Sequence, residues 1–373
     1  MTDSNAQRWP CESCGAELRY VPGQSSLVCE YCGHRQQIPE AGDRVSAAAW
    51  HEYSLAQGLA DDLPDSARIQ APSTRCTNCG ALIEFDGASH ATECPFCASV
   101  VVADTGQGRR IKPQALIPFI LSESEARQAM VNWLGRLWFA PPKLVSYARH
   151  GRKMNGVYVP HWTFDAVTRS RYSGKRGDVY YVTVTVTVNV NGRPQEQTRQ
   201  EPRIRWTPVS GQVARDFDDV LVLGSSSLPR AMAEHLQPWD MRELVPYSAD
   251  YLAGFNAEGY TIPLGDASKD SKEKMAQVIE GDIRADIGGD QQQISAVSTS
   301  YSAETFKHIL LPIWAAAYKY NGKSYRFLVN GQTGEVQGER PYSIWKIVLA
   351  ALTVIILAVG AYYLAEANGF RFD

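Results

Sequence analysis

The sequence lacks the short motifs that carry the common catalytic chemistries. It contains no GxxxxGK(S/T) loop for nucleotide phosphates, no GxSxG nucleophile turn, no HExxH metal-binding helix and no GxGxxG dinucleotide turn. It also has little net charge, −3 at pH 7, so no overall basic field attracts nucleic acid. These absences argue against a nucleotide-driven motor and against the common hydrolases, and we expect no enzymatic activity.

The sequence also has no cysteine outside a CxxC pair. All eight cysteines fall in CxxC pairs, and in each block of two pairs fourteen residues separate the pairs: Cys11 and Cys14, Cys29 and Cys32, Cys76 and Cys79, Cys94 and Cys97. The second block repeats the first 65 positions later. Two facing CxxC turns aim four thiolates at one point, which suits a structural Zn²⁺ with no open position for water or substrate. We therefore predict two four-cysteine zinc ribbons with two structural zinc ions. Disulfides or a redox CxxC are the alternatives, and neither His34 nor His90 is needed as a ligand.

The C-terminal stretch from Ile347 to Ala365 lacks both charge and proline. As a helix rising about 1.5 Å per residue it would be roughly 28 Å long, enough to cross a bilayer core. Arg340 and Lys346 precede this run, and that small basic excess predicts that the N-terminal bulk is cytoplasmic. The N-terminus carries no apolar stretch of the signal-peptide kind. We predict a single-pass tail anchor in the inner (cytoplasmic) membrane; a buried core helix is the alternative.

Alternating patterns predict strands in the middle of the chain. Tyr181 to Val190 reads YVTVTVTVNV, with valine on one face and threonine on the other, which is typical of a long half-buried strand. Asn191-Gly192 predicts a hairpin turn into a polar return strand from Gln195 to Trp206. A second hairpin is expected where Ala315–Tyr320 and Lys323–Val329 flank Asn321-Gly322.

Helical patterns are fewer. Val45 to Leu59 is alanine-rich, and Ser122-Glu-Ser-Glu125 is a capping box that opens a helix ending before Pro141. Asp266 to Ile287 is expected to be a helix whose apolar face carries Met275, Val278, Ile279, Ile283 and Ile287.

Together these patterns predict an α+β fold class: two N-terminal zinc ribbons with four cysteine ligands each, a β-rich α+β cytoplasmic domain and one C-terminal transmembrane helix. The expected boundaries are 1–40 for ribbon 1, 41–72 for a helical linker, 73–104 for ribbon 2, 105–342 for the β-rich domain, 343–366 for the transmembrane helix and 367–373 for a short tail.

This set of features resembles a family of bacterial membrane proteins with two zinc ribbons of the transcription factor IIB type. The resemblance rests on both cysteine blocks, on Pro160-His-Trp162 and Pro312-Ile-Trp314, on the hairpin from Tyr318 to Phe327 and on the apolar tail. Such proteins often carry a primosomal protein N′-like or helicase-like label. Some are encoded beside phage-shock PspA-like and SPFH (flotillin-like) proteins, which implies a membrane adaptor in envelope stress with those proteins as partners. The missing phosphate loop contradicts motor activity.

We therefore expect a membrane-anchored adaptor or scaffold that recruits protein partners to the lipid bilayer, and homo-oligomerisation stays open. The alternative is a tethered nucleic-acid binder, which the acidic balance of the ribbons disfavours. Its contact, or a contact with lipid head groups, would be the basic loop Arg149, Arg152 and Lys153. The carboxylates Asp216, Asp218 and Asp219 could bind a cation or act in acid–base chemistry, but such runs are usually solvated loops.

Overall fold

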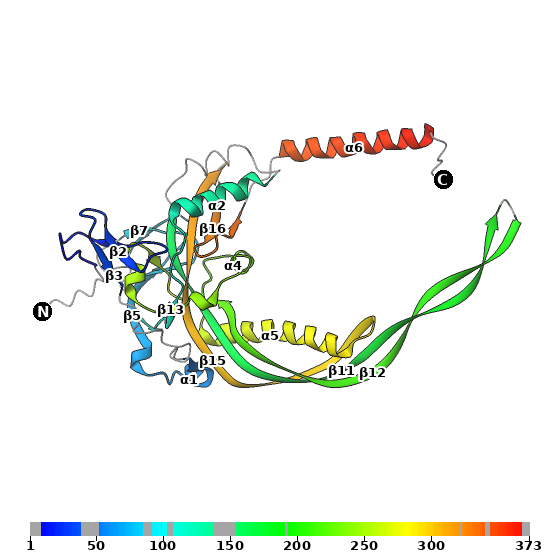
Figure 1. Ribbon diagram of the computed structural model, residues 1–373, viewed down its shortest axis with the longest axis horizontal. Helices are drawn as coiled ribbons and strands as arrows, with labels where there is room; N and C mark the ends of the chain where they lie inside the picture. The colour runs from blue at the N-terminus through cyan, green and yellow to red at the C-terminus, as the bar shows by residue number, and fades with distance from the viewer. Residues whose placement is uncertain are drawn as a thin grey trace.

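The computed structural model describes residues 9–38, 52–84, 91–97, 99–102, 107–137, 154–190, 193–320, 323–339 and 344–367. Figure 1 shows three long strands forming a curved band, with smaller elements gathered around one end of it. These strands are β11 (Asn155–Val190), β12 (Arg193–Leu223) and β15 (Gln291–Tyr320). The described chain is therefore dominated by β structure, as the alternating patterns predicted.

The main sheet has the order β12-β11-β15-β10-β13, with β10 at Ala115–Leu116 and β13 at Val245–Pro246. β11 is antiparallel to both of its long neighbours. β15 also pairs with β16 (Lys323–Asn330), which pairs with β17 (Val336–Gly338), so the second predicted hairpin is confirmed. The predicted strand at Tyr181–Val190 is the far half of β11, and its return strand is the first part of β12.

Two β-bulges bend the band at the level of Asp165. The register of β11 shifts against β12 between Phe164 and Ala166, and against β15 between Asp165 and Val167. Each neighbouring strand has a residue with positive φ there, Asp219 (53°) and Ala303 (50°). A bulge inserts one residue and bends the strand, so bulges on both sides of β11 curve the sheet at one place.

Helix α5 (Leu264–Ile287) lies along the inner side of this curve (Figure 1). Ile279, Ile283 and Ile287 are buried against Tyr172 of β11 and against apolar side chains of β12. The predicted helix from Asp266 is thus confirmed, but Val278 is 44 % exposed and does not belong to the buried face. The opposite, outer face of the band carries exposed polar and basic side chains.

The smaller helices agree in part with the prediction. α2 (Glu123–Gly135) begins at the predicted capping box, with Ser122 and Glu125 bonded reciprocally. The helix predicted over 45–59 begins outside the described residues, and within them it needs correction. Tyr53–Ser54 form strand β4 on β15, and only Leu55–Leu59 form helix α1. The Tyr53 ring packs near Phe306 of β15, and this tertiary contact outweighs local helix propensity.

The first cysteine block folds into strands β1 (Leu18–Tyr20), β2 (Ser26–Cys29) and β3 (Arg35–Gln37). The second block contains β6 (Leu82–Glu84), β7 (Ala91–Glu93) and β8 (Val100–Val102), and β6 pairs with β5 (Arg68–Arg75), which also pairs with β9 (Gln107–Ile111). Below, ribbon 1 denotes residues 9–38 and ribbon 2 the described residues between 73 and 102.

The two ribbons pack on opposite faces of the sheet at its crowded end. Ribbon 1 shares a hydrophobic cluster with α2, Tyr158 and Trp314. Ribbon 2 shares another with α4 (Arg230–Glu234), Val157 and Val159. Successive residues of a strand point to opposite faces, so Tyr158 and its two neighbours anchor different ribbons. Neither ribbon is a separate knob joined only by a linker.

The prediction of a transmembrane helix requires correction. The tail does form a helix, α6 (Ile344–Ala367), with exposed apolar side chains. Within the described part of the chain, however, no helix is both long and apolar enough to cross a membrane.

Candidate metal centres

The four cysteines of ribbon 1 converge on one point. The Sγ atoms of Cys11 and Cys32 are 3.6 Å apart, and those of Cys14 and Cys29 are 3.5 Å apart. All four sulfur atoms lie within 4.8 Å of one another. A disulfide would need sulfurs about 2 Å apart, whereas a tetrahedral ion bound at about 2.3 Å separates its sulfurs by about 3.8 Å. The arrangement therefore fits a four-thiolate metal ion.

Ribbon 2 repeats this geometry. Cys76 and Cys97 are 3.6 Å apart at sulfur, Cys79 and Cys94 are 3.5 Å apart, and the four sulfurs again lie within 4.8 Å. None of the eight cysteines forms a disulfide. The sequence thus identified both ligand sets, and two four-cysteine clusters able to hold metal ions are established.

Local backbone geometry explains why each CxxC turn closes. Gly15 and Gly80 follow the first pair of each block at φ of 74° and 78°, a region that disfavours residues with a Cβ atom. Their N–H groups donate to the carbonyl oxygens of Cys11 and Cys76, at 2.8 and 2.9 Å. The repeat in the sequence is therefore a repeat of one turn, in which glycine lets two thiols face the same side.

One thiol in each cluster is already biased toward the thiolate that a metal ion requires. The backbone N–H of Cys32 lowers the pKa of Cys29 to about 7. A hydrogen bond from Cys94 lowers the pKa of Cys79 to about 5. Thiolates are the ligands of zinc and related soft ions, so the donor chemistry of both clusters suits such an ion.

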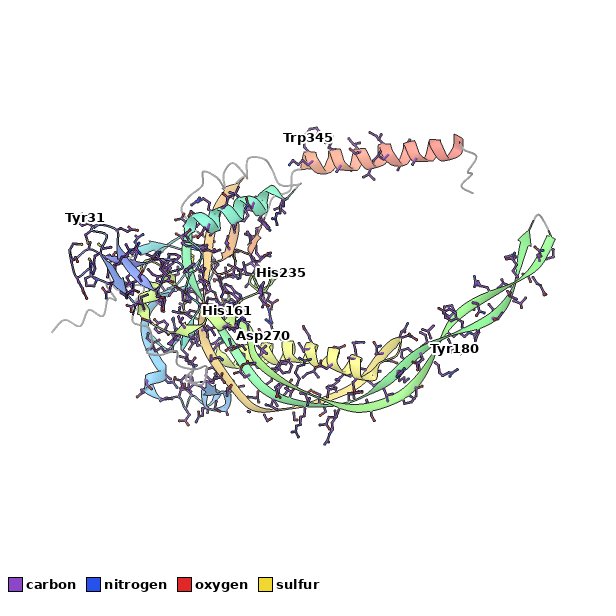
Figure 2. All side chains as sticks on the ribbon, in the orientation of Figure 1. Tyr31, His161, Tyr180, His235, Asp270 and Trp345 are labelled. Atoms are coloured by element: carbon purple, nitrogen blue, oxygen red, sulfur yellow. The ribbon has the colours of Figure 1, made fainter. Side chains whose placement is uncertain are left out.

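The two ribbons differ in the aromatic residue between their last two ligands. Tyr31, between Cys29 and Cys32, is 85 % exposed, and Figure 2 places it at the outer end of ribbon 1. Its equivalent Phe96, between Cys94 and Cys97, is only 1 % exposed and belongs to the cluster shared with the sheet. Ribbon 2 therefore points its turn into the protein, and ribbon 1 points its turn into solvent.

A buried carboxyl beside ribbon 2 was not anticipated from the sequence. Glu258 follows β14 (Asn256–Ala257), forms a β-bridge with Ile83 and accepts a hydrogen bond from the Ser225 hydroxyl at 2.6 Å. Burial raises its pKa to about 8. In the sequence it is a single acid in a polar stretch, with no periodic pattern to mark it as buried.

Two of the three predicted carboxylates, Asp218 and Asp219, do lie together, but they are joined by Asp165 rather than by Asp216. The nearby cation is a lysine side chain. The Lys307 ammonium lies 2.9 Å from Glu52 and 2.8 Å from Asp219, with Asp165 at 4.0 Å. Asp218 also approaches Asp165 and Asp219, but it is exposed. Burial, followed by the neighbouring Glu52, raises the pKa of Asp165 to about 7. This group of charged side chains lies at the bulges and connects Glu52 to the bend of the sheet.

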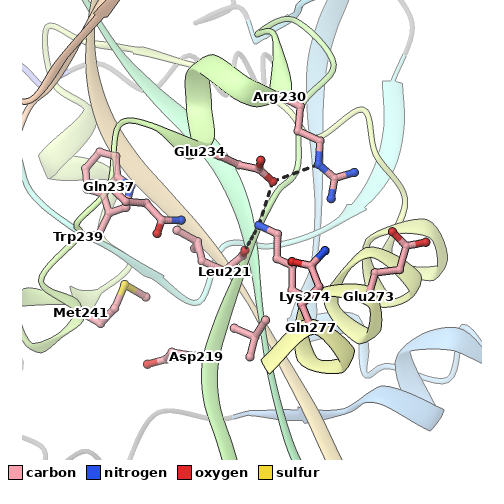
Figure 3. A pocket seen from close by; sticks show the side chains of 11 residues that line it. Asp219, Leu221, Arg230, Glu234, Gln237, Trp239, Met241, Glu273, Lys274 and Gln277 are labelled. Carbon is pink, nitrogen blue, oxygen red and sulfur yellow. Dashed lines mark hydrogen bonds and ion pairs between the residues drawn. The ribbon is translucent and has the colours of Figure 1, made fainter. Parts of the chain in front are cut away.

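A polar hollow of about 660 Å³ adjoins this bend between β12, α4 and α5 (Figure 3). Its basic residues are paired with acidic ones: Glu234 accepts from Arg230 at 3.1 Å and from Lys274 at 3.2 Å. Arg230 also pairs with Asp270, and Lys274 donates to the backbone oxygen of Leu221. These bonds tie the two helices to the sheet and pair both cations with carboxylates.

The basic loop Arg149, Arg152 and Lys153 lies outside the described residues. A different basic row is visible on β11, where Arg169, Arg171 and Lys175 have exposed side chains on the outer face of the band. No ion pair joins these three side chains to any residue in the described ranges. This row was not anticipated from the sequence, because the three basic residues stand in a polar stretch without the apolar alternation that marks a strand.

The fold and these sites define a β-rich protein with two four-cysteine metal-binding clusters packed against one bent sheet. The chain is similar to a protein of Bacillus subtilis (strain 168) named Uncharacterized protein YdjG, with 25 % identity over 345 residues that cover 91 % of each chain. No family model and no solved structure matches the chain. A similarity of that length extends well beyond the cysteine blocks and into the sheet.

Proposed function

We propose that this protein is a zinc-dependent adaptor that recruits protein partners through ribbon 1. The observation that carries the proposal is Tyr31, a large aromatic side chain held in solvent between two cysteines of a metal-binding cluster. Exposed aromatic residues on a rigid frame are frequent binding hot spots, since they bury much surface at little entropic cost. Zn²⁺ is the ion proposed for both clusters, because closed tetrahedral sets of four cysteines are its usual structural sites.

Charge around Tyr31 favours a basic partner surface. Glu12 and Glu30 are exposed in the two turns of ribbon 1, and a Zn²⁺ held by four thiolates carries about two negative charges. Arg19 pairs with Glu30 at 3.4 Å and offsets only part of this charge. A partner with a pocket for an aromatic ring and a basic rim would fit both features.

The resemblance to proteins encoded beside PspA-like and SPFH proteins makes those proteins the first partners to test. We propose that recruitment takes place at the cytoplasmic face of the inner membrane during envelope stress. The exposed apolar side chains of α6, including Trp345 at 83 % exposure, support an association with an apolar phase or partner. Fractionation of cells followed by carbonate extraction tests that location.

Replacing Tyr31 with alanine is expected to weaken partner binding at least about tenfold, the loss of one hot-spot side chain. The measurement is the Kd of the zinc-loaded full chain for purified PspA-like and SPFH-type proteins. Leu59→Ala is the control, because Leu59 is also an exposed apolar side chain, at 52 %, but lies on α1, outside both ribbons. Equal affinities of the two variants would refute docking through ribbon 1, and zinc content should be unchanged in both.

A second candidate function, binding of single-stranded nucleic acid, is favoured by the row of Arg169, Arg171 and Lys175. Arg169 and Arg171 are alternate residues of a strand, about 6.8 Å apart, and Lys175 lies about 13.6 Å further along the same face, so these cations can follow the phosphates of an extended strand. A salt-dependent gel shift with an oligonucleotide tests it: binding at low salt should disappear in Arg169→Glu/Arg171→Glu and persist in Arg199→Glu, whose base already pairs with Glu201. No binding by the wild type at low salt removes this candidate.

A further inference from the structure

The far end of β11 and β12 is a two-stranded arm, defined here as residues 178–190 and 193–205. β15 stops pairing with β11 at Gly177, and among the described residues no other strand continues beside the arm. Figure 1 shows the arm extending well past the end of β15. An isolated two-stranded ribbon is only marginally stable in water, so pairing with a further strand would stabilise the arm.

Backbone hydrogen bonds establish which residues of β11 face the open edge. The Val179 N–H donates to the Asp290 carboxylate at 2.6 Å, and the Gly177 carbonyl oxygen accepts from the Asp290 N–H at 2.9 Å. Both groups therefore point away from β12, toward the side that β15 occupies earlier in the sheet. The direction alternates along a strand, so Tyr181, Thr183, Thr185 and Thr187 present their N–H and C=O groups on the same open side.

The opposite edge of the arm is blocked by proline. Pro194 and Pro202 in the arm, and Pro208 just before it joins the wider sheet, lie across from Asn189, Tyr181 and Lys175 of β11, whose backbone N–H and C=O groups point away from β12. The three prolines therefore point their ring nitrogens away from β11 and remove no bond from the hairpin. A proline has no N–H to offer a further strand, so this placement prevents strand addition on the β12 edge.

The open edge of β11 carries none of these protections. From Tyr181 to Val190 the strand has neither proline nor charge, whereas the neighbouring stretch of β12 has Arg199, Glu201 and Arg203. An uncharged, extended, exposed edge with high β-propensity is a template for another strand. One edge of the same hairpin is thus protected, and the other is left available.

We propose that two copies of this chain pair through the β11 edge of the arm, antiparallel about a two-fold axis, into a four-stranded sheet. In such a pair open-side residues meet open-side residues, so with Thr185 on the two-fold axis Thr183 lies opposite Thr187, and valine lies opposite valine. Because neither strand carries a charge between Tyr181 and Val190, pairing leaves no unpaired carboxylate or ammonium at the interface. A second copy therefore matches this edge in shape, period and charge.

A matched pair of substitutions tests the proposal, because Thr185 and Thr198 are cross-strand partners in the same hairpin. Both N–H groups point outward, Thr185 on the open edge and Thr198 on the proline edge. Thr185→Pro should raise the dimer dissociation constant at least about tenfold, whereas Thr198→Pro should leave it unchanged. The measurement is sedimentation equilibrium of the zinc-loaded full chain in a mild detergent.

Cysteine cross-linking provides a second readout that does not depend on proline. Thr185→Cys should form a bismaleimide-linked dimer, and Thr198→Cys should not, with the wild type controlling for the zinc-bound thiols. A monomeric wild type, or a dimer that Thr185→Pro leaves intact, overturns the proposal. Cross-linking of Thr185→Cys only to a different protein would also overturn it, since the open edge would then bind a partner strand instead.

Discussion

Replacing Cys76 and Cys79 with serine is expected to disrupt the sheet domain as well as ribbon 2. Cys76, Ile83 and Phe96 are buried in a cluster shared with Val157 and Val159 of β11, so the metal organises part of the main core. The binding free energy of a structural zinc is folding free energy, about 10 kcal/mol or more in isolated fingers. We expect a loss of at least about 5 kcal/mol and loss of a single cooperative unfolding transition.

The matched variant is Cys11→Ser/Cys14→Ser in ribbon 1. Its turns point into solvent, with Cys14 and Cys32 exposed, although its strands still pack on Phe119 and Tyr158. Each variant should hold one zinc ion per chain where the wild type holds two, as measured by metal analysis. Thermal unfolding should then rank the ribbon 2 variant as the less stable; the opposite order would show that ribbon 2 is the more independent unit.

Replacing Lys307 with methionine is expected to cost about 3–5 kcal/mol at pH 8, the usual effect of removing one partner from a buried ion pair. The change leaves Glu52, Asp165 and Asp219 facing one another without a cation. Lys269→Met is the control, since among the described residues this exposed lysine pairs only with Asp266, three residues away, and its loss should cost less than about 0.5 kcal/mol. Chemical denaturation of both variants gives the comparison.

The cost of Lys307→Met should shrink as the pH falls. The pKa of Asp165 is about 7 in the folded protein, above its ordinary value, so the folded state holds that proton more tightly than the unfolded chain. Its favourable contribution is complete below the unfolded pKa and disappears as the pH rises through about 7. Removing the ammonium raises the pKa of Asp165 further, so protonation of that carboxyl as the pH falls toward about 5 relieves part of the repulsion. A deficit that is independent of pH between about 5 and 8 would contradict this account.

Local patterns identified the elements whose signals are short-range. The spacing of Cys11, Cys14, Cys29 and Cys32 identified the ligands, because metal geometry demands close pairs of thiols. Ser122 and Glu125 marked the start of α2, since a capping box is completed within four residues. The valine–threonine alternation marked the far half of β11 for the same reason. The tail run predicted a helix, which is present as α6, but its length and lack of charge led to a transmembrane helix that the described chain does not contain.

Other features depended on contacts between residues far apart in the chain. Nothing local distinguishes Tyr31 from Phe96, because both stand between two ligands in equivalent turns. Their exposures differ because ribbon 2 packs its last CxxC turn, with Phe96, against the sheet, whereas the equivalent turn of ribbon 1 faces solvent. Tyr53 entered a strand rather than a helix because Phe306, far along the chain, lies beside it in space.

The sequence by itself determined the metal ligands, the β-rich class and the uncharged, proline-free edge of the arm, because spacing and alternation act over a few residues. Tertiary structure alone decided that the ribbons brace the sheet from both sides, that Lys307 holds three carboxylates at the bend, and that one edge of the arm stays open. Each of these features depends on which segments, distant in the sequence, come into contact. Burial, ion pairing and strand pairing all need both segments, so neither segment alone predicts them.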